Sequence, residues 1–240
     1  GLGDVYKRQA VIEALKEIVP ADKVLLQEPM KLHTTFRIGG PADCLVYLEN
    51  EEQLCKIQKY LRLVDVPYTV IGNGSNLLVS DQGYAGIVLV VGKHMSRIEV
   101  KDCYLEAEAG ALMSQVAKAA KEHGLTGLEF AAGIPGTIGG GAVMNAGAYG
   151  GEMKDVTEEV TVLTEEGEVK TLKREELKMG YRTSIIAEKG YLVLEAVLQL
   201  TDGDLKEIRA VMEDLKKKRI SKQPLEYPSA GSTFKRPKGY

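Results

Sequence analysis

The sequence contains no tryptophan, only three cysteines and three histidines, and no long apolar run. Cys44, Cys55 and Cys103 are odd in number and lack C-x-x-C or Cys/His spacing, so a disulfide framework and a zinc site are disfavoured, and no metal site is predicted. The histidines stand in unrelated contexts, which leaves a Ser-His-Asp triad without support; we expect them to be surface or packing residues. No stretch of 18 charge-free apolar residues predicts a membrane span, and no basic-then-apolar secretion signal opens the chain. We therefore expect a reducing, cytoplasmic setting.

Charge of neither sign is in clear excess, with 31 Lys plus Arg against 34 Asp plus Glu and a net charge of −3. Nucleic-acid-binding proteins generally carry a strongly basic surface, so this balance argues against such a partner. Apolar residues make up 44% and charged residues 27% of the 240, as is usual for a soluble globular protein of one large or two small domains. We expect no nucleic-acid partner, no membrane partner and a monomer.

The hydrophobic pattern mixes helices and strands without strict alternation. Apolar residues at helical spacing predict helices over 10–19, 51–63, 113–123 and from Asp204 onward, the last with Leu205, Ile208, Val211, Met212 and Leu215 facing inward. Strands are predicted over 43–48, 68–71, 86–91, 104–109, 160–163, 168–172 and 191–200, with a hairpin turn at 165–167. This order favours an α+β fold over a doubly wound sheet, with boundaries near 92–95 and 201–204.

Glycine is abundant, at 26 residues, and it is concentrated in two segments. In the first, Val70-Ile71-Gly72-Asn73-Gly74-Ser75-Asn76-Leu77-Leu78, a buried strand enters a tight turn. Successive backbone N–H groups in such a turn point into one concavity, which suits an anion such as a diphosphate. A plain β-turn is the alternative.

The second glycine-rich segment covers 127–151, where nine of the 25 residues are Gly and only Glu129 is charged. Flexible linkers favour Ser and charge, so this neutral segment indicates a long loop whose backbone packs closely against a flat or polyanionic group. It matches neither a P-loop nor a Rossmann fingerprint. Close glycine packing between elements is the alternative.

Two further segments carry candidate side chains. Gly180-Tyr181-Arg182-Thr183-Ser184 offers a fixed cation for a substrate carboxylate, although a lone arginine there is also compatible with a surface charge. Ser221-Lys222-Gln223-Pro224 is followed by a segment in which Ser232 comes after Gly231, which would place a hydroxyl on a sharp turn. No G-x-S-x-G elbow is present.

These four segments in this order, together with Thr34-Thr35-Phe36-Arg37-Ile38-Gly39-Gly40-Pro41-Ala42, resemble the UDP-N-acetylenolpyruvoylglucosamine reductase (MurB) family from about Leu25 to the end. The resemblance implies an FAD-binding fold of the vanillyl-alcohol-oxidase (PCMH) type, with two α+β subdomains and the start of a third, substrate-binding domain. It also implies that NADPH reduces a non-covalently bound FAD, which then reduces UDP-N-acetylglucosamine-enolpyruvate to UDP-N-acetylmuramate for peptidoglycan synthesis.

The resemblance also assigns site residues. It implies that Arg182 stabilises the developing negative charge and that Ser232 donates the proton. Tyr181, Arg182, Lys222 and Ser232 would bind substrate. The residues implied to bind FAD are Gly72, Asn73, Gly74, Ser75, Asn76, Leu77, Ala132, Gly133, Ile134, Pro135, Gly136, Gly139, Gly140, Asn145 and Gly147.

The expected domain division is a leader over 1–9, FAD-binding subdomains over 10–92 and 93–203, and the start of the third domain over 204–240. The family's catalytic glutamate lies near its C-terminus, and no counterpart follows Ser232, so we expect a C-terminally truncated chain. Arg236 and Gly141 depart from the family's more usual Asn and Ala. Another FAD-dependent oxidoreductase of the same fold, or an inactive FAD-binding fragment, remains the alternative.

Overall fold

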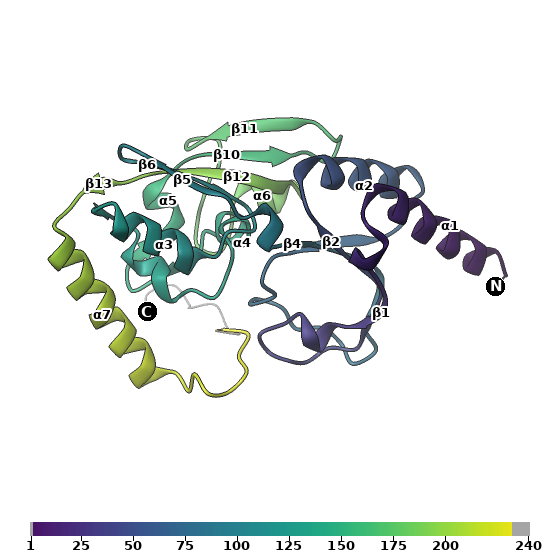
Figure 1. Ribbon diagram of the computed structural model, residues 1–240, viewed down its shortest axis with the longest axis horizontal. Coiled ribbons are helices and arrows are strands. Elements are labelled where there is room, and N and C mark those ends of the chain that lie inside the picture. The colour runs from purple at the N-terminus through teal and green to yellow at the C-terminus, as the bar shows by residue number, and fades with distance from the viewer. Residues whose placement is uncertain (1, 232–240) are drawn as a thin grey trace.

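The computed structural model describes residues 2–231, and their side chains from residue 7 onward. Two sheets form its body (Figure 1). The four-stranded sheet has the order β1-β2-β4-β3, with β1 Val24–Pro29, β2 Pro41–Leu48, β3 Tyr68–Ile71 and β4 Tyr84–Val91. The five-stranded sheet has the order β11-β10-β12-β6-β5, with β5 Ile98–Lys101, β6 Tyr104–Glu108, β10 Thr157–Leu163, β11 Val169–Lys173 and β12 Leu192–Gln199.

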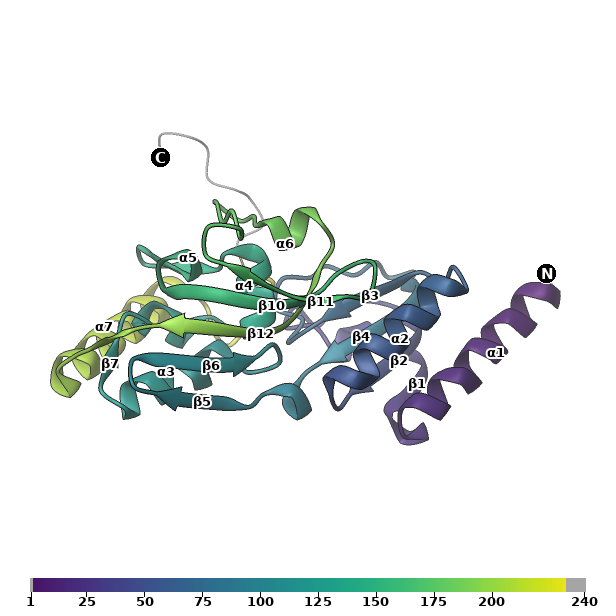
Figure 2. The ribbon, with the colours of Figure 1, turned by 90° about the horizontal axis from the view of Figure 1, so that it is seen from above.

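Helices cover both sheets, and short elements connect them. The α-helices are α1 Leu2–Ile18, α2 Glu51–Leu63, α3 Met113–Glu122, α4 Ile138–Met144, α5 Met153–Val156, α6 Ile185–Glu188 and α7 Leu205–Lys222. The 3-10 turns are η1 Ala21–Lys23, η2 Met30–Leu32, η3 Lys93–Met95 and η4 Glu129–Gly133, and the two-residue strands are β7 Leu125–Thr126, β8 Gly147–Ala148, β9 Gly151–Glu152 and β13 Thr201–Asp202. The first and last helices, α1 and α7, lie at opposite ends of the molecule (Figure 2).

The four-stranded sheet is parallel in its centre, where β4 lies between β2 and β3 and runs parallel to both. Ile87, Leu89 and Val91 of β4 pack with the buried residues of α1 and α2, whereas Val88 and Val90 belong to a second cluster with Met30 of η2. Burial on both faces explains why β4 is a continuous apolar run, as parallel strands usually are. The face of the sheet that carries Val88 and Val90 is the one that borders the candidate site.

Most of the predicted long elements are confirmed. α2 spans 51–63 as predicted, because Asn50 caps it by accepting a hydrogen bond from Gln53 N (2.9 Å). The alternation over 104–109 is also confirmed, since Leu105 and Ala107 are buried while Tyr104 and Glu106 are exposed. The sequence pattern missed β1 and β5, which are short edge strands.

Three predictions about the elements need correction. The first helix begins at Leu2 rather than residue 10, so residues 2–9 are helical. On α7, Leu205 and Val211 are exposed, and Ile208 is the residue of this helix that is buried. The segment 127–151 is not a long loop, because it contains η4, α4 and the β8–β9 hairpin. A helix with three consecutive glycines has low intrinsic propensity and depends on tertiary packing, which periodicity does not reveal.

Candidate functional site

A groove of about 440 Å³ opens where the parallel strands of the four-stranded sheet end. Its wall includes Ile71 at the end of β3, Gly72 and Asn73 after it, Val90 and Gly92 at the end of β4, and Thr137 at the start of α4. Its other lining residues come from the 32–35 segment, β2, η3 and the start of α3: Leu32, His33, Thr34, Thr35, Tyr47, Lys93, Ser96, Gly110, Leu112 and Gln115. Ligands of sheets with parallel strands commonly bind beyond the carboxyl ends of those strands. This central groove is therefore the candidate site.

The first glycine-rich segment forms a turn at the edge of the central groove. Gly74 has φ +61°, and a Cβ atom there would lie 1.9 Å from the carbonyl oxygen of His33. No hydrogen bond within the described chain takes up the backbone N–H groups of Asn73, Gly74 and Ser75. Three successive free N–H groups are what an anion-binding turn offers.

The second glycine-rich segment offers less free backbone than the sequence suggested. The N–H groups of Ile138 and Gly139 donate to the carbonyl oxygens of Ala111 (2.8 Å) and Ala109 (2.9 Å). Those of Gly140 and Gly141 donate to the side-chain and backbone oxygens of Thr137. The backbone N–H groups at the start of α4 are thus already hydrogen-bonded within the protein. The glycines of this helix allow close packing, since a Cβ at Gly139 would lie 2.9 Å from Ala109 Cβ.

The structure brings the two glycine-rich segments into direct contact. A Cβ at Gly72 would lie 2.3 Å from Thr137 Oγ1, and the side-chain amide of Asn73 donates to Pro135 O at 2.6 Å. The side-chain amide of Asn73 therefore joins the two segments by a hydrogen bond. The two segments share one edge of the central groove, which is the arrangement that a common ligand requires.

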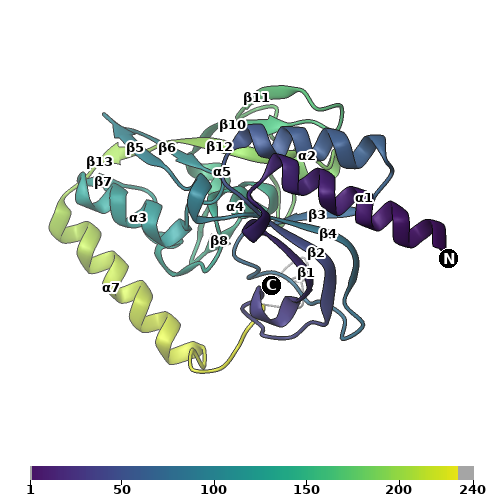
Figure 3. The same cartoon turned by 45° about the vertical axis from the view of Figure 1, so that its right-hand side comes forward.

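The segment after α7 also returns to this groove (Figure 3). Ser229 N donates to Thr35 O (3.2 Å), and Thr35 Oγ1 donates to Ser229 O (2.6 Å). Thr35 N in turn donates to Gly74 O (3.1 Å), so the 229–231 segment and the anion-binding turn are linked through one residue. Ser232 lies outside the described residues.

His33 is a groove residue that the sequence reasoning missed. Its Nε2 lies 2.8 Å from Glu28 Oε1 and its Nδ1 lies 3.3 Å from the Tyr47 hydroxyl, so the three side chains form a chain of hydrogen bonds. Burial raises the pKa of Tyr47, and the neighbouring Glu28 carboxylate adds to the shift. The contacts join β1, the end of η2 and β2, and no local motif marks them.

Arg219 of α7 is a second missed residue. Its guanidinium lies against the second glycine-rich segment, with Nη1 3.0 Å from where a Cβ of Gly133 would be. Its Nε is buried and has no hydrogen-bond partner among the described residues. Arg219 belongs to a run of four cations over 216–219 near the end of α7, and no sequence pattern shows which of the four turns toward Gly133.

Arg182 lies at the other end of α4 from the groove edge. It has φ +56° and occupies a tight turn closed by paired hydrogen bonds between Gly180 and Thr183. Its Cζ lies 5.9 Å from the centre of the Tyr181 ring, a cation–π distance. The turn is tied to α4 by Asn145, whose Nδ2 donates to Gly180 O at 2.9 Å.

The remaining predicted residues are placed as follows. Lys222 is the last residue of α7 and is exposed, and Asn76 is exposed beside the half-buried Ser75 and Leu77. Gly147 packs on Glu152, where a Cβ would lie 2.7 Å from Glu152 Cγ. Within the 132–140 part, Gly133, Pro135 and Gly140 are exposed and Ala132, Ile134 and Gly136 are half-buried.

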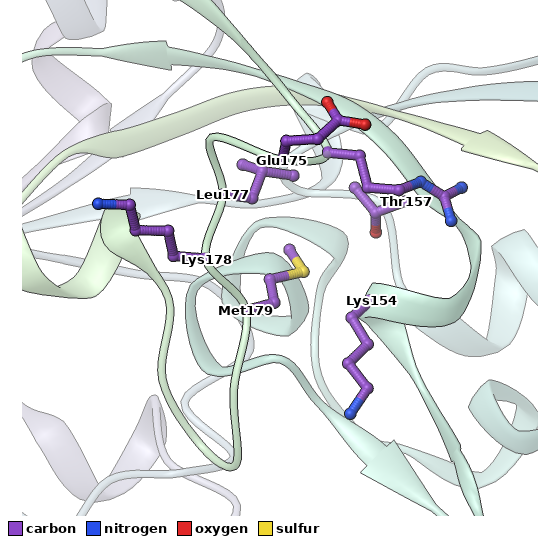
Figure 4. A pocket seen from close by; sticks show the side chains of 7 residues that line it. Lys154, Thr157, Glu175, Leu177, Lys178 and Met179 are labelled. Atoms are coloured by element: carbon purple, nitrogen blue, oxygen red, sulfur yellow. The ribbon is translucent and has the colours of Figure 1, made fainter.

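A second cavity, of about 280 Å³, is lined in part by Leu177, Lys178 and Met179, which precede the Arg182 turn. Lys154, Arg174 and Lys178 line it, but Lys154 pairs with Glu152 (2.8 Å) and Arg174 with Glu158 (3.3 Å). Figure 4 shows the side chains of Lys154, Lys178 and Glu175 pointing apart rather than toward a common centre. This cavity therefore lacks a convergent set of charges.

Comparison with known proteins places these features in a family. The profile of a family described as an FAD binding domain matches residues 42–173. The UDP-N-acetylenolpyruvoylglucosamine reductase of Agathobacter rectalis is 52% identical over 97% of this chain and 77% of its own length. That of Caldanaerobacter subterraneus is 49% identical over 97% of this chain and 76% of its own length.

Solved structures of related proteins have the same fold. The UDP-N-acetylenolpyruvylglucosamine reductase of Thermus caldophilus superposes with a TM-score of 0.75 at 35% identity, over 89% of this chain and 74% of that one. The 4-ethylphenol oxidase of Gulosibacter chungangensis superposes with a TM-score of 0.62 at 15% identity, over 82% of this chain and 43% of that one. The predicted α+β FAD-binding fold is thus confirmed. Within the described residues, no helix is long and apolar enough to span a membrane.

Proposed function

The chain belongs to the UDP-N-acetylenolpyruvoylglucosamine reductase family, and from this we propose that it reduces UDP-N-acetylglucosamine-enolpyruvate to UDP-N-acetylmuramate. FAD is its cofactor, and NADPH is the proposed reductant. The reaction serves peptidoglycan synthesis in the cytoplasm. The proposed partners are these small molecules, with no nucleic acid or membrane, and the proposed state is a monomer.

The observation that carries the proposal is that the N–H groups of Asn73, Gly74 and Ser75 have no hydrogen-bond acceptor among residues 2–231. They lie at the edge of the central groove and beside a second glycine-rich segment, an arrangement that fits a diphosphate with groups on both sides. The buried Nε of Arg219, which has no partner in the described part of the chain, fits an anionic ligand as well. We propose that residues 10–92 and 93–203 act as the two FAD-binding subdomains and that residues from 204 onward serve the substrate.

Bound FAD supplies the hydride chemistry, and the protein supplies position and charge. Addition of hydride to the enolpyruvyl double bond leaves negative charge on the carbon next to the carboxylate. Arg182 stabilises this charge, and its guanidinium can hold a carboxylate by two parallel hydrogen bonds. Ser232 then donates its proton to that carbon. Tyr181 and Lys222 complete the proposed substrate contacts.

Two half-reactions test the proposal. The purified protein should be yellow, and denaturant should release free FAD. In stopped-flow measurements, NADPH should bleach the flavin absorbance and the enolpyruvyl substrate should restore it. A colourless protein that does not bind added FAD contradicts the cofactor, whereas a flavin that is reduced but not reoxidised by this substrate indicates another oxidoreductase of the same fold.

Gly72→Ala should weaken FAD binding about 100-fold, because the new Cβ would overlap Thr137. Thr137 cannot easily move, since it is 4% exposed and its Oγ1 caps α4. Fluorescence titration of the apoprotein with FAD measures the effect. Thr137→Ala in the same chain should restore most of the affinity by removing Oγ1 and Cγ2. Asn50→Ala, which removes the cap of α2 and does not line the groove, should leave the affinity unchanged. No recovery in the double variant would contradict the steric explanation.

A further inference from the structure

Asn145 is buried at the point where α4, the β8–β9 hairpin and the Arg182 turn meet. It ends α4 in the left-handed conformation, with φ +43° and ψ +58°, and is 2% exposed. Its Nδ2 donates to Gly180 O (2.9 Å) and to Glu152 Oε2 (3.0 Å), and its Oδ1 accepts from Lys154 N (2.9 Å). Both amide hydrogens are therefore taken by the protein, which leaves Asn145 no donor for a cofactor.

The Gly180 carbonyl that Asn145 holds belongs to the turn that carries Arg182. This turn is otherwise closed by Gly180 N to Thr183 O (3.0 Å) and by the longer Thr183 N to Gly180 O (3.3 Å). Arg182 itself has φ +56°, a conformation that is unfavourable for a residue other than glycine and needs support from its surroundings. The amide of Asn145 supplies that support from outside the turn.

The same amide donates to the carboxylate of Glu152, which is near enough to Arg182 for the two charges to interact. Glu152 also accepts a hydrogen bond from Lys154 Nζ (2.8 Å). These contacts lower the pKa of Glu152, chiefly through Lys154, with further contributions from Asn145 and the charge of Arg182. Glu152 is thus a fixed negative charge near the guanidinium.

We propose that Asn145 is a positioning residue, which ties the Arg182 turn and Glu152 to the end of α4. The inference rests on the proposed function, since it acts through the role of Arg182 toward the substrate. α4 begins at Thr137 in the central groove and ends at Asn145, so one short helix connects the cofactor groove with the substrate cation. A shift of about 1 Å in a reacting group can cost roughly 100-fold in rate.

Asn145→Gly is the informative variant, because glycine accepts the left-handed conformation and removes only the amide. We expect reoxidation of the reduced flavin by the enolpyruvyl substrate to slow about 30-fold, while FAD affinity and flavin reduction by NADPH change less than threefold. In an Arg182→Ala background the same substitution should slow reoxidation less than threefold, because its effect passes through Arg182. Asn145→Asp should resemble Asn145→Gly, since a carboxylate cannot donate to Gly180 O. Asn50→Gly, another helix-terminal asparagine, is the control.

Amide hydrogen exchange gives a readout that is independent of turnover. Exchange at Gly180 and Thr183 should quicken at least tenfold in Asn145→Gly and remain unchanged in Asn50→Gly. Equal slowing of reoxidation with and without Arg182, or unchanged exchange, would overturn the inference, as would a loss of FAD affinity as large as the loss of rate. If the unsubstituted protein is not reoxidised by the substrate, the proposed function fails and the inference fails with it; if it is, only the inference is in question.

Discussion

Replacing Ser232 by alanine should slow reoxidation of the reduced flavin by the enolpyruvyl substrate about 10⁴-fold, the upper range for a positioned proton donor. Flavin reduction by NADPH should be unchanged, because that half-reaction needs no proton at the substrate carbon. A serine hydroxyl is a weak acid, but the carbon that receives the proton is a strong base, so the transfer is favourable when the two groups are held together. Stopped-flow absorbance separates the two half-reactions.

The chain contains a matched control for this substitution. Ser229 precedes Ser232 by three residues and binds Thr35 through its backbone, which Ser229→Ala retains. That variant should reoxidise within threefold of the unsubstituted protein. If Ser232→Ala reoxidises as fast as Ser229→Ala, another group donates the proton.

Replacing Arg182 by alanine should slow the same reoxidation about 1000-fold, because a preorganised cation at developing charge contributes on this scale. FAD affinity should change less than threefold, since Arg182 does not line the central groove. Arg182→Lys should recover only part of the rate, because an ammonium group lacks the planar fork that binds a carboxylate by two hydrogen bonds.

Backbone strain needs its own control at this position. Arg182 has φ +56°, so alanine would be strained there, whereas Arg182→Gly is not. If the guanidinium matters, the Gly and Ala variants should be equally slow. Recovery of the rate in Arg182→Gly, or a parallel loss of FAD in both variants, would make Arg182 a structural residue.

Periodicity and turn chemistry allowed much of the fold to be predicted from the residues alone. The apolar spacing of α2 and the alternation of β6 are local signals, and the structure agrees with both. The glycine-rich segments were also recognised as candidate ligand-binding backbone. These features lie within a few residues of one another, so their energetics can be judged without the rest of the chain.

Contacts between distant residues were beyond such reasoning. The helix α4 exists because Thr137 caps it and because Gly139 fits against Ala109, and Arg219 reaches Gly133 from a helix 86 residues further along. The family resemblance implied that Asn145 binds FAD, and the structure shows that its amide donates to Gly180 and Glu152. Residue types suggest what chemistry a side chain offers. Which hydrogen bonds it makes depends on the neighbours that packing brings to it, and those neighbours come from elsewhere in the chain.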